Sequence, residues 1–228
     1  MLQLPCCYGN NHPLQGGKQS PWECGIRAAA FVTGGYLPKD RVGKVENGMM
    51  HISDWYTTFC EMTGVDRYDS NAAKHNLPPV EGYNIWPLIA GINETSPRTQ
   101  LPVDETTLID DGYKFLIGDA IPQAAWGGPQ FPNSSTPEHG VVGPQANLNC
   151  SNGCLFDLMH DLTEHNDIAM DNKDIVNKMN NTLNQLIEGF YRNNDTLIES
   201  CPKNANKSFN KQNSKAEGVA IGQESTAL

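Results

Sequence analysis

The sequence predicts an α/β protein that ends in a small α+β domain, with a four-stranded antiparallel sheet and a packed helix. Two observations support this prediction. Short apolar runs separated by turn residues recur between residues 100 and 158, a pattern typical of strands joined by turns. An apolar stripe at helical spacing follows at residues 171–191, and such a stripe needs another element to cover.

The composition is that of a folded protein with an acidic surface. The chain has 228 residues, of which 38% are hydrophobic, and a formal net charge of -10. This length suffices for one sizeable domain or a domain with an appendage. The negative charge argues against a nucleic-acid partner. Since no apolar run approaches about 18 residues, we expect no membrane-spanning helix. The sequence does not indicate the oligomeric state.

An apolar run near the N-terminus is expected to form a buried strand. The letters IRAAAFV, residues 26–32, are followed by paired glycines, and their small number suits a strand better than a helix. The loop before this run carries Lys18 next to two glycines and leads into Trp22 and Glu23. The lysine is therefore expected where the strand begins.

Residues 51–64 are predicted to form a helix with one apolar face. Ser53 or Asp54 is the candidate N-cap and Gly64 the candidate stop. His51 and Asp54 lie three positions apart at the helix start, where we expect a cap and a packing residue rather than a catalytic pair. The face expected to be buried consists of residues three or four positions apart: Ile52, Trp55, Phe59 and Met62.

The second half of the chain contains most of the strand signals. A proline-rich connection at residues 71–99 includes a helical turn around residues 86–90. The pair Asp111-Gly112 predicts a hairpin turn between two strands. The four expected strands are residues 100–103, 107–109, 113–117 and 155–158.

Two further segments lack strand signals. Residues 127–147 are punctuated by proline and glycine and are expected to be a loop. Residues 201–228 consist largely of Asn, Ser, Lys and Gly, a composition that predicts a disordered tail.

The seven cysteines include one candidate disulfide. Because seven is an odd number, at least one cysteine lacks an intrachain partner. Cys150 and Cys154 flank the polar turn SNG and could close a small loop. A zinc site is the competing interpretation, but no second Cys or His pair lies at ligand spacing. We therefore expect no metal site from these residues.

Glycosylation signals indicate passage through the secretory pathway. Roughly two N-x-Ser/Thr sequons are expected by chance in a chain of this composition, and the sequence has more. We expect a lysosomal or extracellular protein, although the first residues do not form a signal peptide. The candidate acceptors are Asn93, Asn133, Asn149, Asn180, Asn194 and Asn206.

Several of these segments resemble the sulfatase family. NNHPLQGGKQSPWECGIRAAAFV is similar to the sulfatase pattern N-x-P-L-R-G-x-K-x-S-x-W-E-G-G-V-R, and HISDWYTTFCEMTG to the helix motif I-H-I-S-D-W-x-P-T-L. EGYNIWPLIAG resembles D-G-x-D-x-W-P-x-L-x-G, SPRT precedes a strand as in the family, and CLFDLMHDLTEHNDIA resembles C-L-F-D-I-x-x-D-P-x-E-x-x-D-L-A. The motifs occur in the family's order between Asn10 and Ala169. The arylsulfatase B type, which removes 4-sulfate from N-acetylgalactosamine, is the most similar.

The resemblance implies an alkaline-phosphatase-like α/β fold, of which this chain matches only the C-terminal portion. Residues 1–70 would be the closing segment of the large domain and 71–99 a connection. Residues 100–200 would be the small C-terminal α+β domain, and 201–228 a disordered tail.

The resemblance also implies which parts of the family's active site this chain carries. Lys18 matches the lysine that binds the sulfate. The family's nucleophile is a formylglycine made from cysteine in a C-x-P-S-R context, and this string does not occur in the chain. The family also holds a calcium ion, and its acidic ligands are absent from this chain as well. No other cofactor is expected.

The sequence departs from the family's motifs at three positions. Gln15 replaces an arginine, Cys24 replaces the first glycine of W-E-G-G, and Leu162 replaces a proline. For Cys24 we expect a conflict where the backbone needs a positive φ or a close approach.

Other polar residues are expected to be structural. His139, His160 and His165 have no metal-ligand spacing, and Asp157, Asp161 and Glu164 are interpreted as turn and cap residues. Cys201 matches a family cysteine that bonds to the large domain, so here an unpaired thiol is expected.

Two hypotheses of function follow. In the first, the chain is the C-terminal portion of an arylsulfatase that hydrolyses the sulfate ester of a small molecule or glycan, and the chain by itself is inactive. In the second, it is a non-catalytic secreted glycoprotein or binding module derived from a sulfatase. The substrate is not indicated.

Overall fold

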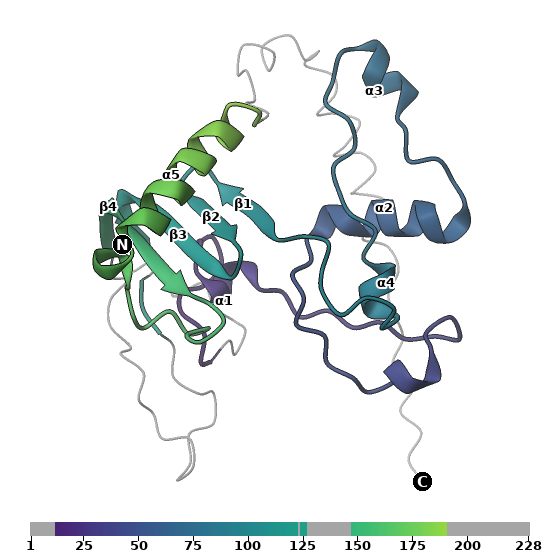
Figure 1. Cartoon of the computed structure of the whole chain (residues 1–228), viewed down its shortest axis with the longest axis horizontal. Helices are drawn as coiled ribbons and strands as arrows, with labels where there is room; N and C mark the ends of the chain where they lie inside the picture. The colour runs from purple at the N-terminus through teal and green to yellow at the C-terminus, as the bar shows by residue number, and fades with distance from the viewer. Residues whose placement is uncertain (1–11, 123, 127–146, 191–228) are drawn as a thin grey trace, which may run out of the picture. The chain divides into compact units, whose positions relative to one another are not determined.

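The computed structural model describes residues 12–122, 124–126 and 147–190 (Figure 1). The chain divides into two compact units, Met1–Glu188 and Gly189–Leu228. Nearly all described residues belong to the first unit. The predicted tail and most of the predicted loop at 127–147 lie outside the described residues.

A four-stranded antiparallel sheet in the order β1-β2-β3-β4 forms the centre of the C-terminal part. Its strands are β1 (Gln100–Asp104), β2 (Thr107–Asp110), β3 (Tyr113–Ile121) and β4 (Leu148–Asp157). Asp111 and Gly112 both have positive φ and form the turn between β2 and β3, as the Asp-Gly pair predicts. The predicted sheet is therefore confirmed, although β4 begins seven residues before the predicted Leu155.

Helix α5 (Lys173–Ile187) covers one face of the sheet (Figure 1). Its Met179 and Leu183 are almost fully buried against Leu108, Phe115 and Leu155. These contacts remove large apolar side chains from water, which stabilises the domain by about 1.5–3 kcal/mol per side chain. The predicted packed helix is confirmed.

The opposite face of the sheet is covered by the segment that contains Lys18 and Trp22, here called the motif segment. Because side chains alternate along a strand, Leu116 and Phe156 point away from α5. They pack with Trp22, which is 0% exposed. The Trp22 ring meets the Phe156 ring edge-on at 5.7 Å, and its Nε1 donates to the Pro122 carbonyl at 2.8 Å. The short helix α1 (Glu23–Ile26) follows directly.

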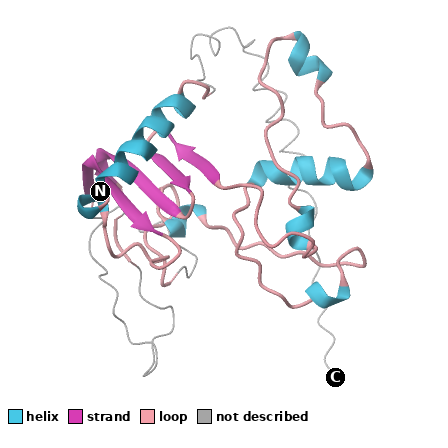
Figure 2. Cartoon of the chain, viewed as in Figure 1, coloured by secondary structure: helices cyan, strands magenta, loops and turns pink. Residues whose placement is uncertain are grey.

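The strand predicted at residues 26–32 is wrong. Ile26 ends α1, and residues 27–33 have no regular structure and pair with no strand in the described part of the chain. The apolar side chains are exposed, with Phe31 89% accessible. Figure 2 shows how little regular structure lies between α1 and α2 (Ile52–Thr63), where only the short 3-10 helix η1 (Lys39–Arg41) occurs. A strand needs a hydrogen-bonded neighbour, and the apolar run cannot supply one.

Helix α2 (Ile52–Thr63) confirms the helix predicted at 51–64 and its stop at Gly64, which adopts φ 70. The N-cap is His51, not Ser53 or Asp54, because the His51 side chain accepts from the Ser53 amide while Asp54 accepts from the His51 amide. The predicted buried face is also wrong. Ile52 is 77% and Phe59 55% exposed, whereas the buried side chains are Asp54, Thr57, Thr58 and Cys60.

The connection between α2 and the sheet contains two short helices. Helix α4 (Trp86–Ile89) is the helical turn expected near residue 86, and α3 (Ser70–Lys74) was not predicted. A 3-10 helix η2 (Ala169–Asp171) precedes α5.

No described helix is long and apolar enough to cross a membrane. The domain boundaries proposed from the sequence stay predictions.

Candidate functional site

Lys18 lies on an exposed tight turn. The turn is closed by the Ser20 hydroxyl, which donates to the Gly17 carbonyl at 2.7 Å and accepts from the Gly17 amide at 3.1 Å. Gln19 adopts φ 70, so the chain reverses direction directly after the lysine. The Lys18 side chain is exposed, while Gly17 and Ser20 on either side are buried. The turn thus carries an exposed lysine on a closed backbone loop.

The start of this turn is attached to the sheet side of the molecule by backbone bonds. The Gly16 amide donates to the Ala125 carbonyl at 2.8 Å, and the Cys24 amide to the Gln15 carbonyl at 2.9 Å. Gln15 also pairs with Trp126 as an isolated antiparallel bridge. Gly16 adopts φ 82, and a Cβ there would lie 2.5 Å from the Trp22 Cβ. Only glycine fits this approach.

The end of the turn is attached to a buried group of charges. Lys114 on β3 is 0% exposed, and its Nζ lies 2.7 Å from Glu23 Oε1 and 2.7 Å from Glu164 Oε1. The same ammonium donates to the Pro21 carbonyl at 3.0 Å. Glu164 Oε2 accepts from the Glu23 amide at 2.9 Å. Arg27 lies 3.6 Å from Glu23 at the border of this group, so two carboxylates face two cations.

Glu164 closes a turn, as the sequence suggests, because its amide donates to the Asp161 carbonyl at 3.1 Å, but its side chain has a further role. Its side chain is fully inside the protein, and burial raises the pKa of its carboxyl although Lys114 acts in the opposite direction. A charged group is removed from water only when it is paired and hydrogen-bonded. Glu164 is therefore part of the packing that joins the motif segment to the sheet. The sequence offers no signal for this contact, because Glu164 and Lys114 are 50 residues apart.

The departures from the sulfatase pattern have different structural consequences. Gln15 is 2% exposed, so the position of the family's arginine is inside the protein here. Cys24 lies in α1 without a positive φ, so the expected positive-φ conflict is wrong, while the expected close approach at this position stays a prediction. The tight position is Gly25, where a Cβ would overlap the carbonyl oxygens of Ser20 and Gly17.

Asp54 and His51 serve the helix start, as expected. Asp54 accepts two hydrogen bonds from Arg98, at 2.9 and 2.6 Å, and two more from the backbone amides of His51 and Tyr83. Arg98 belongs to the SPRT motif, for which the sequence indicated no role. The Asp54 carboxylate is fully engaged in these structural contacts, so Asp54 and His51 do not form a catalytic pair.

The remaining acidic and histidine candidates make local contacts. Asp157 accepts from the Met159 amide and lies 2.9 Å from His160, and Asp161 accepts from the Asn166 amide. His165 stacks on Trp126 with centroids 4.3 Å apart. These are turn contacts, as predicted for Asp157 and Asp161. His139 lies outside the described residues, as does Cys201.

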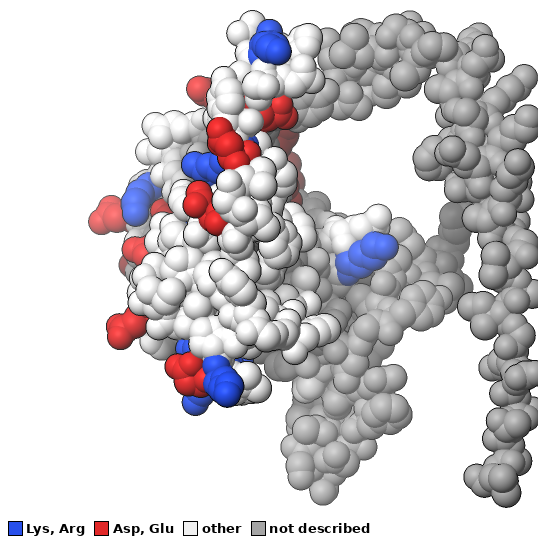
Figure 3. All heavy atoms as spheres, turned by 90° about the vertical axis from the view of Figure 1, so that its right-hand side faces the viewer, with Lys and Arg blue, Asp and Glu red and all other residues white. Residues whose placement is uncertain are grey.

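The described residues do not fit a calcium site. No group of three or more His, Cys, Asp or Glu side chains among them could hold a metal ion. The charged side chains visible on the described surface in Figure 3 are of both signs and scattered among uncharged ones.

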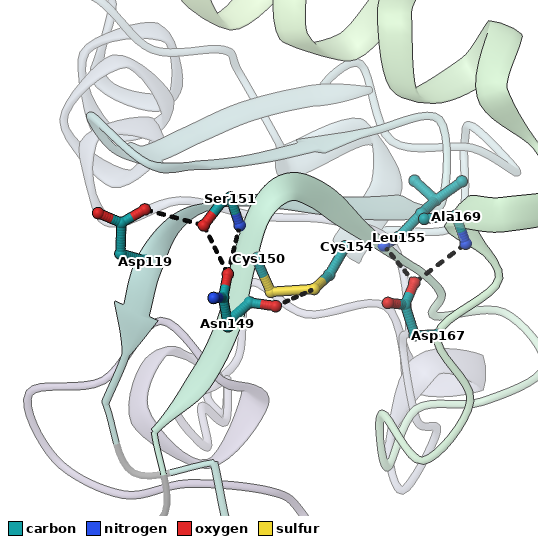
Figure 4. The surroundings of a disulfide bond; sticks show 8 residues. All are labelled: Asp119, Asn149, Cys150, Ser151, Cys154, Leu155, Asp167 and Ala169. Carbon is teal, nitrogen blue, oxygen red and sulfur yellow. Dashed lines mark hydrogen bonds between the residues drawn. A yellow bond between two sulfur atoms is a disulfide. The ribbon is translucent and has the colours of Figure 1, made fainter.

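Cys150 and Cys154, the candidate pair, are joined by a disulfide within β4 (Figure 4). Both are buried against Trp22 and Leu116. The neighbouring Asn149 is exposed, and its Oδ1 accepts from the Ser151 hydroxyl at 2.6 Å. Ser151 also donates to Asp119 at 2.8 Å.

Three of the candidate glycosylation sites can be located. Asn93 and Asn149 are exposed and Asn180 is half-buried on α5. Asn133, Asn194 and Asn206 lie outside the described residues. Whether any of them carries a glycan stays a prediction.

Comparison with known proteins supports the resemblance to sulfatases. No protein-family model matches the chain. A stretch of 98 residues, 42% of the chain, is 35% identical to arylsulfatase J of Mus musculus and covers 14% of that protein. The chain thus corresponds to a small share of this relative's length. The similarity supports a sulfatase relationship but does not single out the arylsulfatase B type.

One solved structure overlays on much of the chain. It comes from work described as "Metabolism of multiple glycosaminoglycans by Bacteroides thetaiotaomicron is orchestrated by a versatile core genetic locus". The overlay has a TM-score of 0.45 and 16% sequence identity, and covers 77% of this chain and 31% of that chain. At this level of similarity the overlay adds nothing to the functional argument.

Proposed function

We propose that this chain is the C-terminal portion of an arylsulfatase-type sulfuric ester hydrolase, and that Lys18 binds the sulfate group of the substrate. The observation that carries the proposal is the exposed Lys18 on a turn that is held at both ends, by Ala125 beyond β3 and by Lys114 on β3. An attached turn holds a side chain in a defined place, and a binding site needs this. The arylsulfatase B type and its 4-sulfated sugar are the finer form of the proposal.

The chemistry suits a lysine. An ammonium group is a compact donor of up to three hydrogen bonds, so it can bind a sulfate oxygen and offset the charge that develops as the S–O bond breaks. Removing one such donor from a preorganised site typically lowers kcat by about 10²–10³. The 228 residues contain no C-x-P-S-R string. We therefore expect the chain to bind a sulfate ester without hydrolysing it.

The proposal extends to the cellular location. The sequons at the exposed Asn93 and Asn149 and the disulfide Cys150–Cys154 are features of proteins that pass through an oxidising compartment. These features support a secreted or lysosomal location for a glycosylated protein. Expression in a secreting cell followed by glycan removal would show a mass decrease if this is right.

Binding can be measured directly with p-nitrocatechol sulfate. In a titration monitored by amide NMR shifts, we expect the signals of Gly17 and Lys18 to move. Lys18→Ala should weaken binding at least tenfold, because a charge-assisted hydrogen bond contributes about 1.5–3 kcal/mol. The control is Lys44→Ala, which removes another exposed lysine and should leave the affinity unchanged. Equal affinity in both variants would contradict the proposal.

Both functional hypotheses expect this chain to be inactive, so binding rather than hydrolysis separates them. We expect no hydrolysis of the same compound by this chain, with or without added calcium. Calcium-dependent release of p-nitrocatechol would overturn the assignment of a missing nucleophile. If the chain neither binds nor hydrolyses the sulfate ester, the alternative of a non-catalytic glycoprotein or binding module is favoured.

A further inference from the structure

The backbone directly after the Lys18 turn is held by two side chains from distant parts of the sequence. Lys114 Nζ donates to the Pro21 carbonyl at 3.0 Å, and Glu164 Oε2 accepts from the Glu23 amide at 2.9 Å. The two side chains also bind each other at 2.7 Å. Lys114 lies on β3, and Glu164 lies in the segment between β4 and α5. These bonds therefore fix the motif segment to two elements of the small domain.

The Lys114 ammonium is held by two hydrogen bonds and an ion pair within this group. It donates to the Pro21 carbonyl and to Glu164 Oε1. Glu23 Oε1 lies 2.7 Å away in an ion pair, although this buried oxygen accepts no hydrogen bond. Lys114 and Glu164 are 0% and 1% exposed. Neither can turn to water without opening the packing around it. Because Lys114 and Glu164 are both buried and hydrogen-bonded to each other and to the backbone, they form a rigid support.

The support is adjacent to the turn itself. Ser20, whose hydroxyl closes the turn, directly precedes Pro21, and the Ser20 side chain is buried. A displacement of Pro21 would move the Ser20 hydroxyl and so the Gly17 backbone next to Lys18. Small misplacements of a binding group can lower its contribution by orders of magnitude. The position of the Lys18 ammonium thus depends on contacts that are far from it in sequence.

We propose that Lys114 and Glu164 are positioning residues for the Lys18 turn. They hold Pro21 and Glu23 on the sheet and so place the lysine for binding a sulfate group. The sulfate part of this inference rests on the function proposed above. The positioning part concerns the geometry of the turn and can be tested without a ligand.

The test compares Lys114→Met with Leu183→Ala. Methionine has a similar length and no charge, so it removes the bonds to Pro21 and Glu164. Leu183 on α5 is 1% exposed, in the core cluster on the other face of the sheet, and its truncation weakens the fold without touching the turn. Hydrogen exchange is measured at Gly16 and Gly17, whose amides are hydrogen-bonded in the turn, and at Phe115 in the sheet.

The expected result is a selective loss of protection. In Lys114→Met the turn amides should exchange at least tenfold faster relative to Phe115. In Leu183→Ala, which opens the cluster around Phe115 itself, this ratio should not rise. The affinity for p-nitrocatechol sulfate should fall about tenfold in Lys114→Met and stay unchanged in Leu183→Ala. If Lys114→Met does not fold, Glu164→Gln is used, because it keeps the side-chain volume and removes the ion pair.

The outcomes distinguish the two proposals. An equal exchange ratio in the two variants overturns the positioning role, whatever the affinity. If Lys18→Ala binds the sulfate ester as well as the wild type, the sulfate-binding function fails, while the exchange ratio still decides the positioning role. Selective loss of turn protection together with weaker sulfate binding supports both.

Discussion

Arg98 and Asp54 are joined by two parallel hydrogen bonds, from Nε to Oδ2 at 2.9 Å and from Nη2 to Oδ1 at 2.6 Å. The Asp54 side chain is 0% exposed and that of Arg98 9%. Arg98 also lies over the Tyr83 ring, 4.9 Å from its centroid. The pair links the first turn of α2 to the segment that leads into β1, which makes it a structural connection rather than a catalytic group.

Asp54→Asn should destabilise the protein by about 3 kcal/mol, because it leaves the Arg98 charge without its partner. Urea unfolding measures the change. The control is Glu46→Gln, which weakens the more exposed pair of Arg41 and Glu46 at 3.0 Å and should change stability by less than about 1 kcal/mol. Equal effects of the two substitutions would show that Asp54 contributes no more than a surface ion pair.

The contribution of Asp54 should also depend on pH. Burial alone would raise the pKa of Asp54, but the bonds from Arg98 and from the amides of Tyr83 and His51 bring it below its usual 3.8. A carboxyl with a lowered pKa stabilises the fold above its unfolded value, and this stabilisation is lost as pH falls through the folded pKa. The difference in unfolding free energy between wild type and Asp54→Asn should therefore shrink below pH 3.8. A constant difference would contradict this.

Glu164 should show the opposite dependence. Burial raises the pKa of Glu164 above its usual 4.5, so the folded state binds a proton more readily than the unfolded state. Its favourable contribution is complete below pH 4.5 and is lost as pH rises through the folded pKa. The unfolding free energy of the wild type minus that of Glu164→Gln should fall from pH 4.5 towards about pH 7. A rise over this range would show that the pairing with Lys114 outweighs burial.

Local signals predicted the sheet and its covering helix well. The Asp111-Gly112 turn and the apolar stripe of α5 depend on residues close together in sequence, and both were found as predicted. The first half of β4 was missed, because the polar letters of NCSNGC do not alternate with apolar ones as a strand usually does.

Long-range contacts decided the remaining features. The run at 26–32 has the letters of a strand but no partner strand in the described part of the chain. Helix α2 buries Asp54 and Thr58 because they bind Arg98, Tyr83 and Ile85, and no helical periodicity shows this. For the site, the motif indicated Lys18 and its glycines, but not the Lys114 and Glu164 contacts that support them.

Gly25→Ala should disturb the Lys18 turn. A methyl group at this position would overlap the Ser20 and Gly17 carbonyl oxygens, and backbone atoms cannot move aside as a flexible side chain can. We expect a loss of stability of about 2 kcal/mol and faster hydrogen exchange at the Gly17 amide. The control is Gly35→Ala, where a Cβ meets nothing within 4 Å and the change should stay within about 1 kcal/mol. Unchanged exchange at Gly17 in Gly25→Ala would contradict the tight packing of this turn.

Reduction of the Cys150–Cys154 disulfide should destabilise the small domain modestly. The two cysteines are separated by four positions in the sequence, and closing so short a loop restricts the unfolded chain little. Chain-entropy arguments give about 2 kcal/mol for a ring of this size. Urea unfolding of the wild type with and without dithiothreitol isolates the bond, because the side-chain volumes stay the same. Cys150→Ala/Cys154→Ala should lose more, since it also removes atoms from the cluster around Trp22. An unfolding midpoint that does not respond to the reductant would show that the bond does not stabilise the fold.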